Sequence, residues 1–155
     1  MSSPLEVGQQ APEFALLNEQ GMEVSLQGLR GKRVILYFYP KDDTPGCTKQ
    51  ACAFRDYHAE LESLNTVVFG VSPDDIKSHK KFKEKYAIPF ALLIDMDHAV
   101  SEAYGVWGER SMYGKTFMGI TRSQFIIDEQ GVLIDVKSPI KPDQSIPRAL
   151  EVLKR

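Results

Sequence analysis

The only two cysteines of the chain, Cys47 and Cys52, lie close together in the segment 39-YPKDDTPGCTKQACAFRD-56. The segment starts with turn-forming residues and continues as a helical pattern, so we expect both cysteines on one helix. On an ideal helix, Cα atoms five positions apart are separated by about 8.7 Å, whereas a disulfide tolerates at most about 7 Å. The two thiols can therefore bond only if the helix unwinds.

The helical pattern also predicts that the two sulfurs point in different directions. Cys52 falls on the side opposite the expected buried stripe, and Cys47 falls at the edge of the buried side. One thiol should therefore face inward and the other outward. The expected stripe consists of Phe54, Tyr57, Leu61 and Leu64.

The position of Cys47 in the first turn of the helix suggests a reactive sulfur. Unpaired backbone N–H groups and the positive end of the helix dipole favour the thiolate, which is the nucleophilic form. Thr44 offers a hydroxyl that can hydrogen-bond a reacting oxygen or cap the helix. We expect Pro40 to stiffen the loop and to shield one side of the sulfur. These residues predict a pocket that activates Cys47 and holds a small polar oxidant.

Other interpretations of the cysteine pair remain open at this point. Cys47 could be an inert buried thiol, or the pair could form a structural disulfide or bind zinc with His58, although C-x4-C is not a zinc-knuckle spacing. A thiol–disulfide oxidoreductase would be expected to carry C-x-x-C. A non-catalytic redox sensor could use the same two cysteines, but its oxidation would be slow and stoichiometric.

Length and charge limit the classes of protein that need to be considered. The chain has 155 residues, with 19 basic and 21 acidic side chains, which gives no electrostatic reason to expect nucleic acid or an anionic membrane as a partner. The start lacks a signal-peptide pattern, and no apolar run approaches about 18 residues. We therefore expect one domain over residues 1–155, located in the cytoplasm, where thiols are kept reduced.

The order of expected elements predicts an α/β fold with a thioredoxin-like layout. A hairpin comes first, strands then alternate with helices, and a second hairpin and a last helix follow, which favours a mixed central sheet with helices on both faces. The first hairpin would be an N-terminal extension of that fold. Strands are expected at 14–18, 22–26, 33–40, 66–72, 91–95, 123–128 and 132–137, helices after Thr44 and at 76–86, 98–104 and 146–153, and a loop at 105–120.

The segment from Pro40 to Cys47 fits the P-x-x-x-[TS]-x-x-C signature of peroxiredoxins, and Cys52 resembles the second cysteine of the bacterioferritin-comigratory, or Prx Q, subfamily. The similarity covers essentially the whole chain, including VILYFYP, CTKQACAFRD, FGVS, YGVWGE and MYGKTFMGITRSQFIID. One departure is Gln124, where a threonine is expected after Arg122. We expect this change to leave the chemistry intact and at most to alter local packing.

The resemblance implies a thiol peroxidase and a role for each matching residue. Cys47 matches the peroxidatic cysteine, which attacks the peroxide O–O bond and becomes a sulfenic acid. Thr44 and Pro40 match the positions that hydrogen-bond and shield the peroxide, and Arg122 matches an arginine that stabilises the thiolate and polarises the O–O bond. Cys52 matches the resolving cysteine, which condenses with the sulfenic acid to form an intramolecular disulfide.

The resemblance further implies the partners of the reaction. The substrate would be hydrogen peroxide or an organic hydroperoxide, and thioredoxin or a similar dithiol would reduce the disulfide. No cofactor or metal is implied, and the protein would be a monomer or a weak homodimer. Phe82 and Trp107 could border the substrate pocket or simply be core or surface aromatics. We expect no catalytic role for the histidines at 58, 79 and 98.

Overall fold

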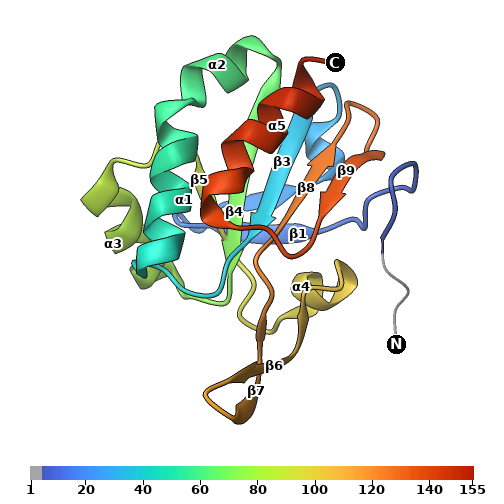
Figure 1. The fold of residues 1–155 in the computed structure, drawn as a ribbon. Coiled ribbons are helices and arrows are strands. Elements are labelled where there is room, and N and C mark those ends of the chain that lie inside the picture. The colour runs from blue at the N-terminus through green and yellow to red at the C-terminus, as the bar shows by residue number, and fades with distance from the viewer. Residues whose placement is uncertain (1–4) are drawn as a thin grey trace.

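A seven-stranded mixed sheet forms the centre of the protein, in the order β2-β1-β5-β4-β3-β8-β9. The computed structural model describes residues 5–155 (Figure 1), so the first four residues of the expected domain lie outside it. The sheet strands are β1 (Ala15–Asn18), β2 (Glu23–Ser25), β3 (Arg33–Phe38), β4 (Thr66–Ser72), β5 (Ala91–Ile94), β8 (Ser123–Ile127) and β9 (Leu133–Lys137). Strands β3, β4 and β5 are parallel, and an antiparallel hairpin joins each edge of this core. The mixed sheet and its N-terminal hairpin confirm the predicted thioredoxin-like layout.

Helices cover the two faces of the sheet unequally. The helices are α1 (Pro45–Asp56), α2 (His58–Ser63), α3 (Ile76–Tyr86), α4 (Ala99–Ala103) and α5 (Ser145–Leu153), with short 3-10 helices η1 (Gln27–Leu29) and η2 (Pro142–Gln144). One face packs against α1, α2, α3 and α5, and the other against α4 and the chain before β3. Strand β3 alternates its side chains between these two cores, which explains its continuous apolar sequence. None of the helices within residues 5–155 is long and apolar enough to cross a membrane.

The helical pattern expected after Thr44 is divided at Tyr57. Its first part ends at Asp56, and Tyr57 leaves the helical conformation with φ −104° and ψ 10° before α2 begins. The prediction that Tyr57 lies in the buried stripe was therefore wrong, because 42% of Tyr57 is exposed. Phe54 and Leu61 are buried, and Leu64 packs against the same core.

Residues 107–120, which the sequence predicted to be a loop, form a second small sheet. Strands β6 (Trp107–Met112) and β7 (Lys115–Ile120) pair as an antiparallel hairpin that projects from the rest of the fold. Tyr113 and Gly114 both have positive φ at its tip, which is typical of a tight hairpin turn. Both strands are largely exposed, so their side chains do not show the apolar alternation that would have predicted them.

Candidate active site

Both cysteines lie on the unbroken helix α1, as the sequence predicted. Pro45 occupies the first helical position and Thr44 the cap, which places Cys47 in the first turn. Cys47 is 1% exposed and Cys52 is half-buried, and both are free thiols. Helical geometry therefore keeps their Cα atoms about 8.7 Å apart, beyond the span of a disulfide.

Arg122 reaches Cys47 because β8 pairs with β3. The register places Ser123 opposite Phe38, so Arg122 lies beside the end of the strand that leads into α1. Its Nη2 donates to the Cys47 sulfur at 3.4 Å. The guanidinium thus places a positive charge and a hydrogen-bond donor beside the sulfur. Gly46 allows this close approach, since a Cβ there would lie 3.0 Å from Arg122 Nη2.

Gln50 holds Arg122 in this position. Its Oε1 accepts a hydrogen bond from Arg122 Nη1 at 2.7 Å, and its Nε2 donates to Ser145 Oγ at 2.8 Å. Gln50 is fully buried and lies one turn after Cys47, on the same side of α1. Neither Gln50 nor Ser145 was predicted from the sequence. A polar residue three positions after a reactive cysteine was the signal that could have identified Gln50.

Thr44 and Pro40 lie at either end of the loop before α1. Thr44 has an extended backbone at the helix cap, and its hydroxyl donates to the carbonyl of Lys41 at 2.8 Å rather than to a helix N–H. The hydroxyl oxygen can still accept a hydrogen bond from a ligand. Pro40 is exposed and, with Arg122, lines an open groove of about 720 Å³.

Comparisons with known proteins confirm the family that the sequence motif indicated. Residues 7–136 match the AhpC/TSA family. The chain is 52% identical over 139 residues to a putative peroxiredoxin Bcp of Coxiella burnetii, covering 90% of this chain and 92% of that one. It is 47% identical over 150 residues to peroxiredoxin Bcp of Bacillus subtilis, covering 97% and 96%. This chain is a peroxiredoxin of the AhpC/TSA family.

Solved structures agree with this assignment. A peroxiredoxin Q of Xanthomonas campestris superposes with a TM-score of 0.86 at 34% identity, covering 91% of this chain and 89% of that one. A mutant of the Xylella fastidiosa Prx Q gives a TM-score of 0.92 at 29% identity, covering 99% and 98%. The peroxiredoxin is thus a Bcp/Prx Q-type thiol peroxidase, and the relatives do not favour a thiol–disulfide oxidoreductase or a non-catalytic sensor.

The groove that Pro40 and Arg122 of the peroxiredoxin line is largely apolar. The β6–β7 hairpin contributes Trp107, Phe117 and Met118 to its lining. Trp107 stacks on His98, with ring centroids 3.6 Å apart. Of the two aromatic residues that the sequence analysis considered, Trp107 therefore borders the groove. Phe82 instead packs in the core beside Tyr39 and Tyr86.

Gln124 lies closer to the site than the sequence analysis indicated. It is fully buried on β8, and its Nε2 donates to the backbone carbonyl of Ser145 at 3.1 Å. Ser145 is the residue whose hydroxyl accepts a hydrogen bond from Gln50. The residue that departs from the family pattern therefore shares Ser145 as a hydrogen-bond partner with Gln50.

The network around Arg122 leads to a first prediction. Replacing Gln50 with leucine would remove one hydrogen-bond partner from Arg122, which is partly buried, and one from Ser145, which is fully buried. We expect Gln50→Leu to slow the reaction of Cys47 with hydrogen peroxide about ten-fold, which corresponds to about 1.4 kcal/mol. Stopped-flow measurement of the peroxide reaction would test this. Lys49→Leu on the exposed side of the same turn is the control, and an equal effect of both changes would contradict the role of Gln50.

Proposed function

We propose that Cys47 is the peroxidatic cysteine of this thiol peroxidase. Its thiolate attacks one oxygen of the peroxide, so that an S–O bond forms while the O–O bond breaks. The second oxygen leaves as hydroxide or alkoxide and takes up a proton, equivalent to the one that the thiol lost on ionisation, to give water or an alcohol, and Cys47 becomes a sulfenic acid. The observation that carries this proposal is the 3.4 Å contact between Arg122 Nη2 and the buried sulfur at the start of α1.

Thr44, Pro40 and Arg122 would act on the peroxide. Arg122 places a positive charge where negative charge develops on the leaving oxygen. The Thr44 hydroxyl would hydrogen-bond the peroxide, and Pro40 would shield one side of it. The position of Pro40 and Arg122 on one groove and of Thr44 at the helix cap supports these roles.

Cys52 would complete the cycle as the resolving cysteine. Its sulfur attacks the sulfenic sulfur, so that an S–S bond forms, the S–O bond breaks and water leaves. The first turns of α1 must unwind for the sulfurs to meet, because both lie on one regular helix. A dithiol such as thioredoxin would then reduce the disulfide by exchange.

The substrates are proposed to be hydrogen peroxide and organic hydroperoxides. A structure of the Xanthomonas campestris bacterioferritin comigratory protein is described in terms of its alkyl peroxide reduction activity. The apolar groove next to Pro40 and Arg122 is consistent with an alkyl group on the substrate. We also propose that the chain forms one domain over residues 1–155, works in the cytoplasm, and is a monomer or a weak homodimer.

Addition of peroxide to the reduced protein tests this function. We expect one equivalent to consume both thiols and to lower the intact mass by about 2 Da, with the chain remaining monomeric on a non-reducing gel. A covalent dimer would contradict the intramolecular disulfide. Thiols that persist in excess peroxide would contradict the peroxidase mechanism itself.

A further inference from the structure

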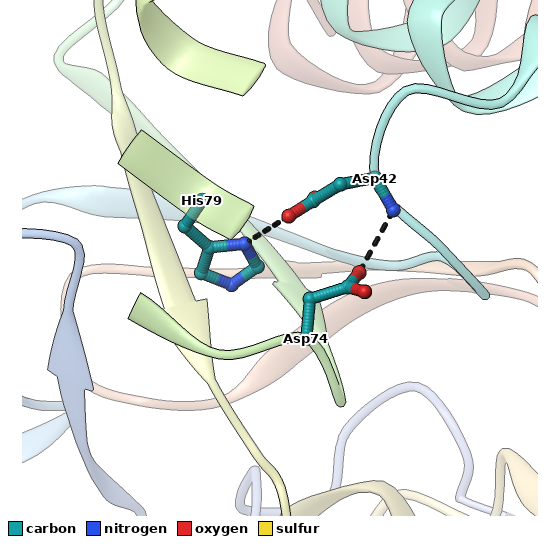
Figure 2. Close-up of side chains that lie close together, drawn as sticks. All are labelled: Asp42, Asp74 and His79. Carbon is teal, nitrogen blue, oxygen red and sulfur yellow. Dashed lines mark hydrogen bonds and ion pairs between the residues drawn. The ribbon is translucent and has the colours of Figure 1, made fainter. Parts of the chain in front are cut away.

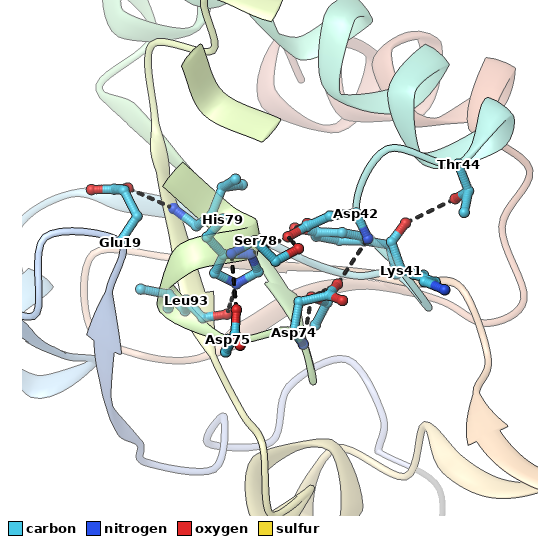
Figure 3. Close-up of polar contacts among 12 residues, drawn as sticks. Glu19, Lys41, Asp42, Thr44, Asp74, Asp75, Ser78, His79 and Leu93 are labelled. Carbon is cyan, nitrogen blue, oxygen red and sulfur yellow. Dashed lines mark hydrogen bonds and ion pairs between the residues drawn. The ribbon is translucent and has the colours of Figure 1, made fainter. Parts of the chain in front are cut away.

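A buried histidine contacts the loop that precedes the reactive cysteine. His79 is 0% exposed and lies in the first turns of α3, which begins at the capping residue Asp75. Its Nδ1 lies 2.6 Å from Asp42 Oδ2, and its Nε2 lies 2.8 Å from the carbonyl oxygen of Leu93 on β5 (Figure 2 and Figure 3). The ring thus connects α3, β5 and the loop between β3 and α1.

The partners of His79 indicate that both of its ring nitrogens donate. A backbone carbonyl can only accept, so Nε2 must carry a proton. The Asp42 carboxylate already accepts from Tyr39 Oη at 2.6 Å and from Ser78 Oγ at 2.8 Å, so both of its oxygens act as hydrogen-bond acceptors. Nδ1 must then donate as well, and the pair is an imidazolium with a carboxylate.

The charge balance around the ring agrees with this assignment. Burial acts to lower the pKa of His79, but the hydrogen bond and charge of Asp42, followed by the Leu93 carbonyl and the charge of Asp74, raise the pKa above its usual value. The neighbouring cation on α3, Lys83, is itself paired with Glu19 of the adjoining β1–β2 hairpin at 3.1 Å. Asp42 and Asp74 each place a carboxylate oxygen within 4.8 Å of a ring nitrogen of His79.

Asp42 is also held through its backbone. Its N–H donates to Asp74 Oδ2 at 2.8 Å, and Ser72 Oγ donates to the same oxygen at 2.7 Å. The carbonyl of the preceding residue, Lys41, accepts the hydroxyl of Thr44. When Asp42 is held in place, the neighbouring Lys41 carbonyl, which accepts the hydrogen bond of the Thr44 hydroxyl, is held in place as well.

The same loop has a second, weaker connection at the surface. Asp43 has a left-handed backbone with φ 56°, and its carboxylate accepts from Lys85 Nζ and Tyr86 Oη, each at 2.8 Å. These hydrogen bonds from Lys85 and Tyr86 lower the pKa of Asp43. Exposed pairs of this kind contribute little to stability, so the buried contact of Asp42 is the stronger restraint on the loop.

Asp42, Asp74 and His79 place their ligand atoms within 4.8 Å of one another, which invites comparison with a metal site. Each of the three side chains is already engaged in the hydrogen bonds described above. Their arrangement is thus explained by the contacts between the loop, α3 and β5.

We infer that the buried His79–Asp42 pair anchors the loop between Pro40 and Thr44 in the position that lets both residues meet a peroxide at Cys47, which makes His79 a positioning residue for peroxide reduction. This inference rests on the proposed role of Cys47. His79 acts on the reaction only through the loop, since its ring contacts Asp42 and Leu93.

Two substitutions of His79 separate positioning from general packing. Asparagine keeps an N–H donor at the place of Nδ1 and can still bond Asp42, whereas glutamine reaches toward Leu93 and loses the Asp42 contact. We expect His79→Gln to slow the reaction with hydrogen peroxide about ten-fold and His79→Asn to stay within about three-fold of the wild type. If His79 served only to fill space, the two variants would slow the reaction to a similar extent.

Asp42→Asn supplies the second half of the test and substitutes for His79→Gln should that variant not fold. If the two residues act as a unit, the double variant Asp42→Asn with His79→Gln will be no slower than the slower single variant. Amide exchange over residues 41–48, followed by mass spectrometry, should be faster in both single variants. His58→Gln is the matched control, because His58 on α2 also lies 2.6 Å from a carboxylate, that of Glu62, while α1 separates α2 from the loop.

The results separate failure of the anchor from failure of the proposed function. Unchanged exchange and peroxide rates in His79→Gln and Asp42→Asn, with a fast wild type, would overturn the anchor and leave the function of Cys47 intact. An equal loss of the peroxide reaction rate in His79→Asn and His79→Gln would also overturn the anchor. So would a loss in His58→Gln as large as that in His79→Gln. A wild type that reacts as slowly as a free thiol would instead contradict the proposed function, while amide exchange would still test the anchor.

The charge of His79 leads to a prediction on pH. A histidine whose folded pKa is raised stabilises the folded state fully below its unfolded pKa of about 6.5, and this contribution is lost as pH rises through the folded value. The stability difference between the wild type and His79→Gln should therefore be largest below about pH 6.5 and should shrink at higher pH. Urea unfolding of both proteins across pH measures it, and a difference that grows with pH would contradict the imidazolium assignment.

Discussion

Replacement of Cys47 by serine should abolish peroxide consumption. A serine hydroxyl stays protonated at neutral pH and is a poor nucleophile, so the O–O bond has no group to attack it. Loss of a nucleophile typically costs at least about 10³-fold in turnover, and we expect Cys47→Ser to fall to the buffer background. Peroxide consumption with a dithiol reductant in excess measures this directly.

The fold of the Cys47→Ser variant should be unaffected, because serine is close in size and, within residues 5–155, Cys47 Sγ makes a single polar contact, with Arg122, at 3.4 Å. Thermal unfolding of the variant provides this control. Peroxide consumption at a tenth or more of the wild-type rate, in a folded variant, would rule out Cys47 as the peroxidatic residue.

Replacement of Cys52 by serine should separate the two halves of the cycle. The first oxidation depends on Cys47 and its surroundings, so the variant should still react once with peroxide. Its mass should then rise by about 16 Da as the sulfenic acid forms, in place of the loss of about 2 Da expected for a disulfide. Intact mass after one equivalent of peroxide distinguishes these outcomes.

Multiple turnover with thioredoxin should be lost in the same Cys52→Ser variant. Thioredoxin reduces disulfides by exchange, and without Cys52 no intramolecular disulfide can form. We expect steady-state turnover to fall about 100-fold or more, within the range found when a residue required for one step is removed. Full thioredoxin-driven turnover in Cys52→Ser would refute the resolving role.

The sequence predicted most elements because their patterns are local. Strand β4 and helix α3 begin and end where the sequence indicated, since a continuous apolar run and an acidic cap define them. Tyr57 was misplaced because its sequence spacing fits a continuous helix. The chain instead leaves the helical conformation at Tyr57, so the side chain no longer follows the buried face. The β6–β7 hairpin was missed because its exposed strands lack the periodic pattern of buried ones.

The candidate site was predictable where its residues follow one another in the chain. Cys47, Thr44 and Pro40 lie within one short segment, and their placement at the start of α1 follows from local turn and helix signals. Arg122 required the family resemblance, because the pairing of β3 with β8 brings it across 75 positions of sequence.

The supporting network could not be predicted in the same way. His79 and Asp42 are 37 positions apart, and Gln50 and Ser145 are 95 positions apart. Nothing in the local sequence distinguishes a buried histidine of this kind from a surface one. Only the packing of α3 and α5 beside α1 reveals which polar residues meet.

The most direct test of the central claim is the rate at which Cys47 reacts with hydrogen peroxide in the folded protein. The Cys52→Ser variant should be used, so that Cys47 alone reports, and glutathione at the same neutral pH provides the comparison. We expect Cys47 to react at least about 100-fold faster than glutathione, since preorganised groups such as Arg122 are typically worth this much. Equal rates for the folded protein and for glutathione would contradict activation of Cys47 by its position in the fold.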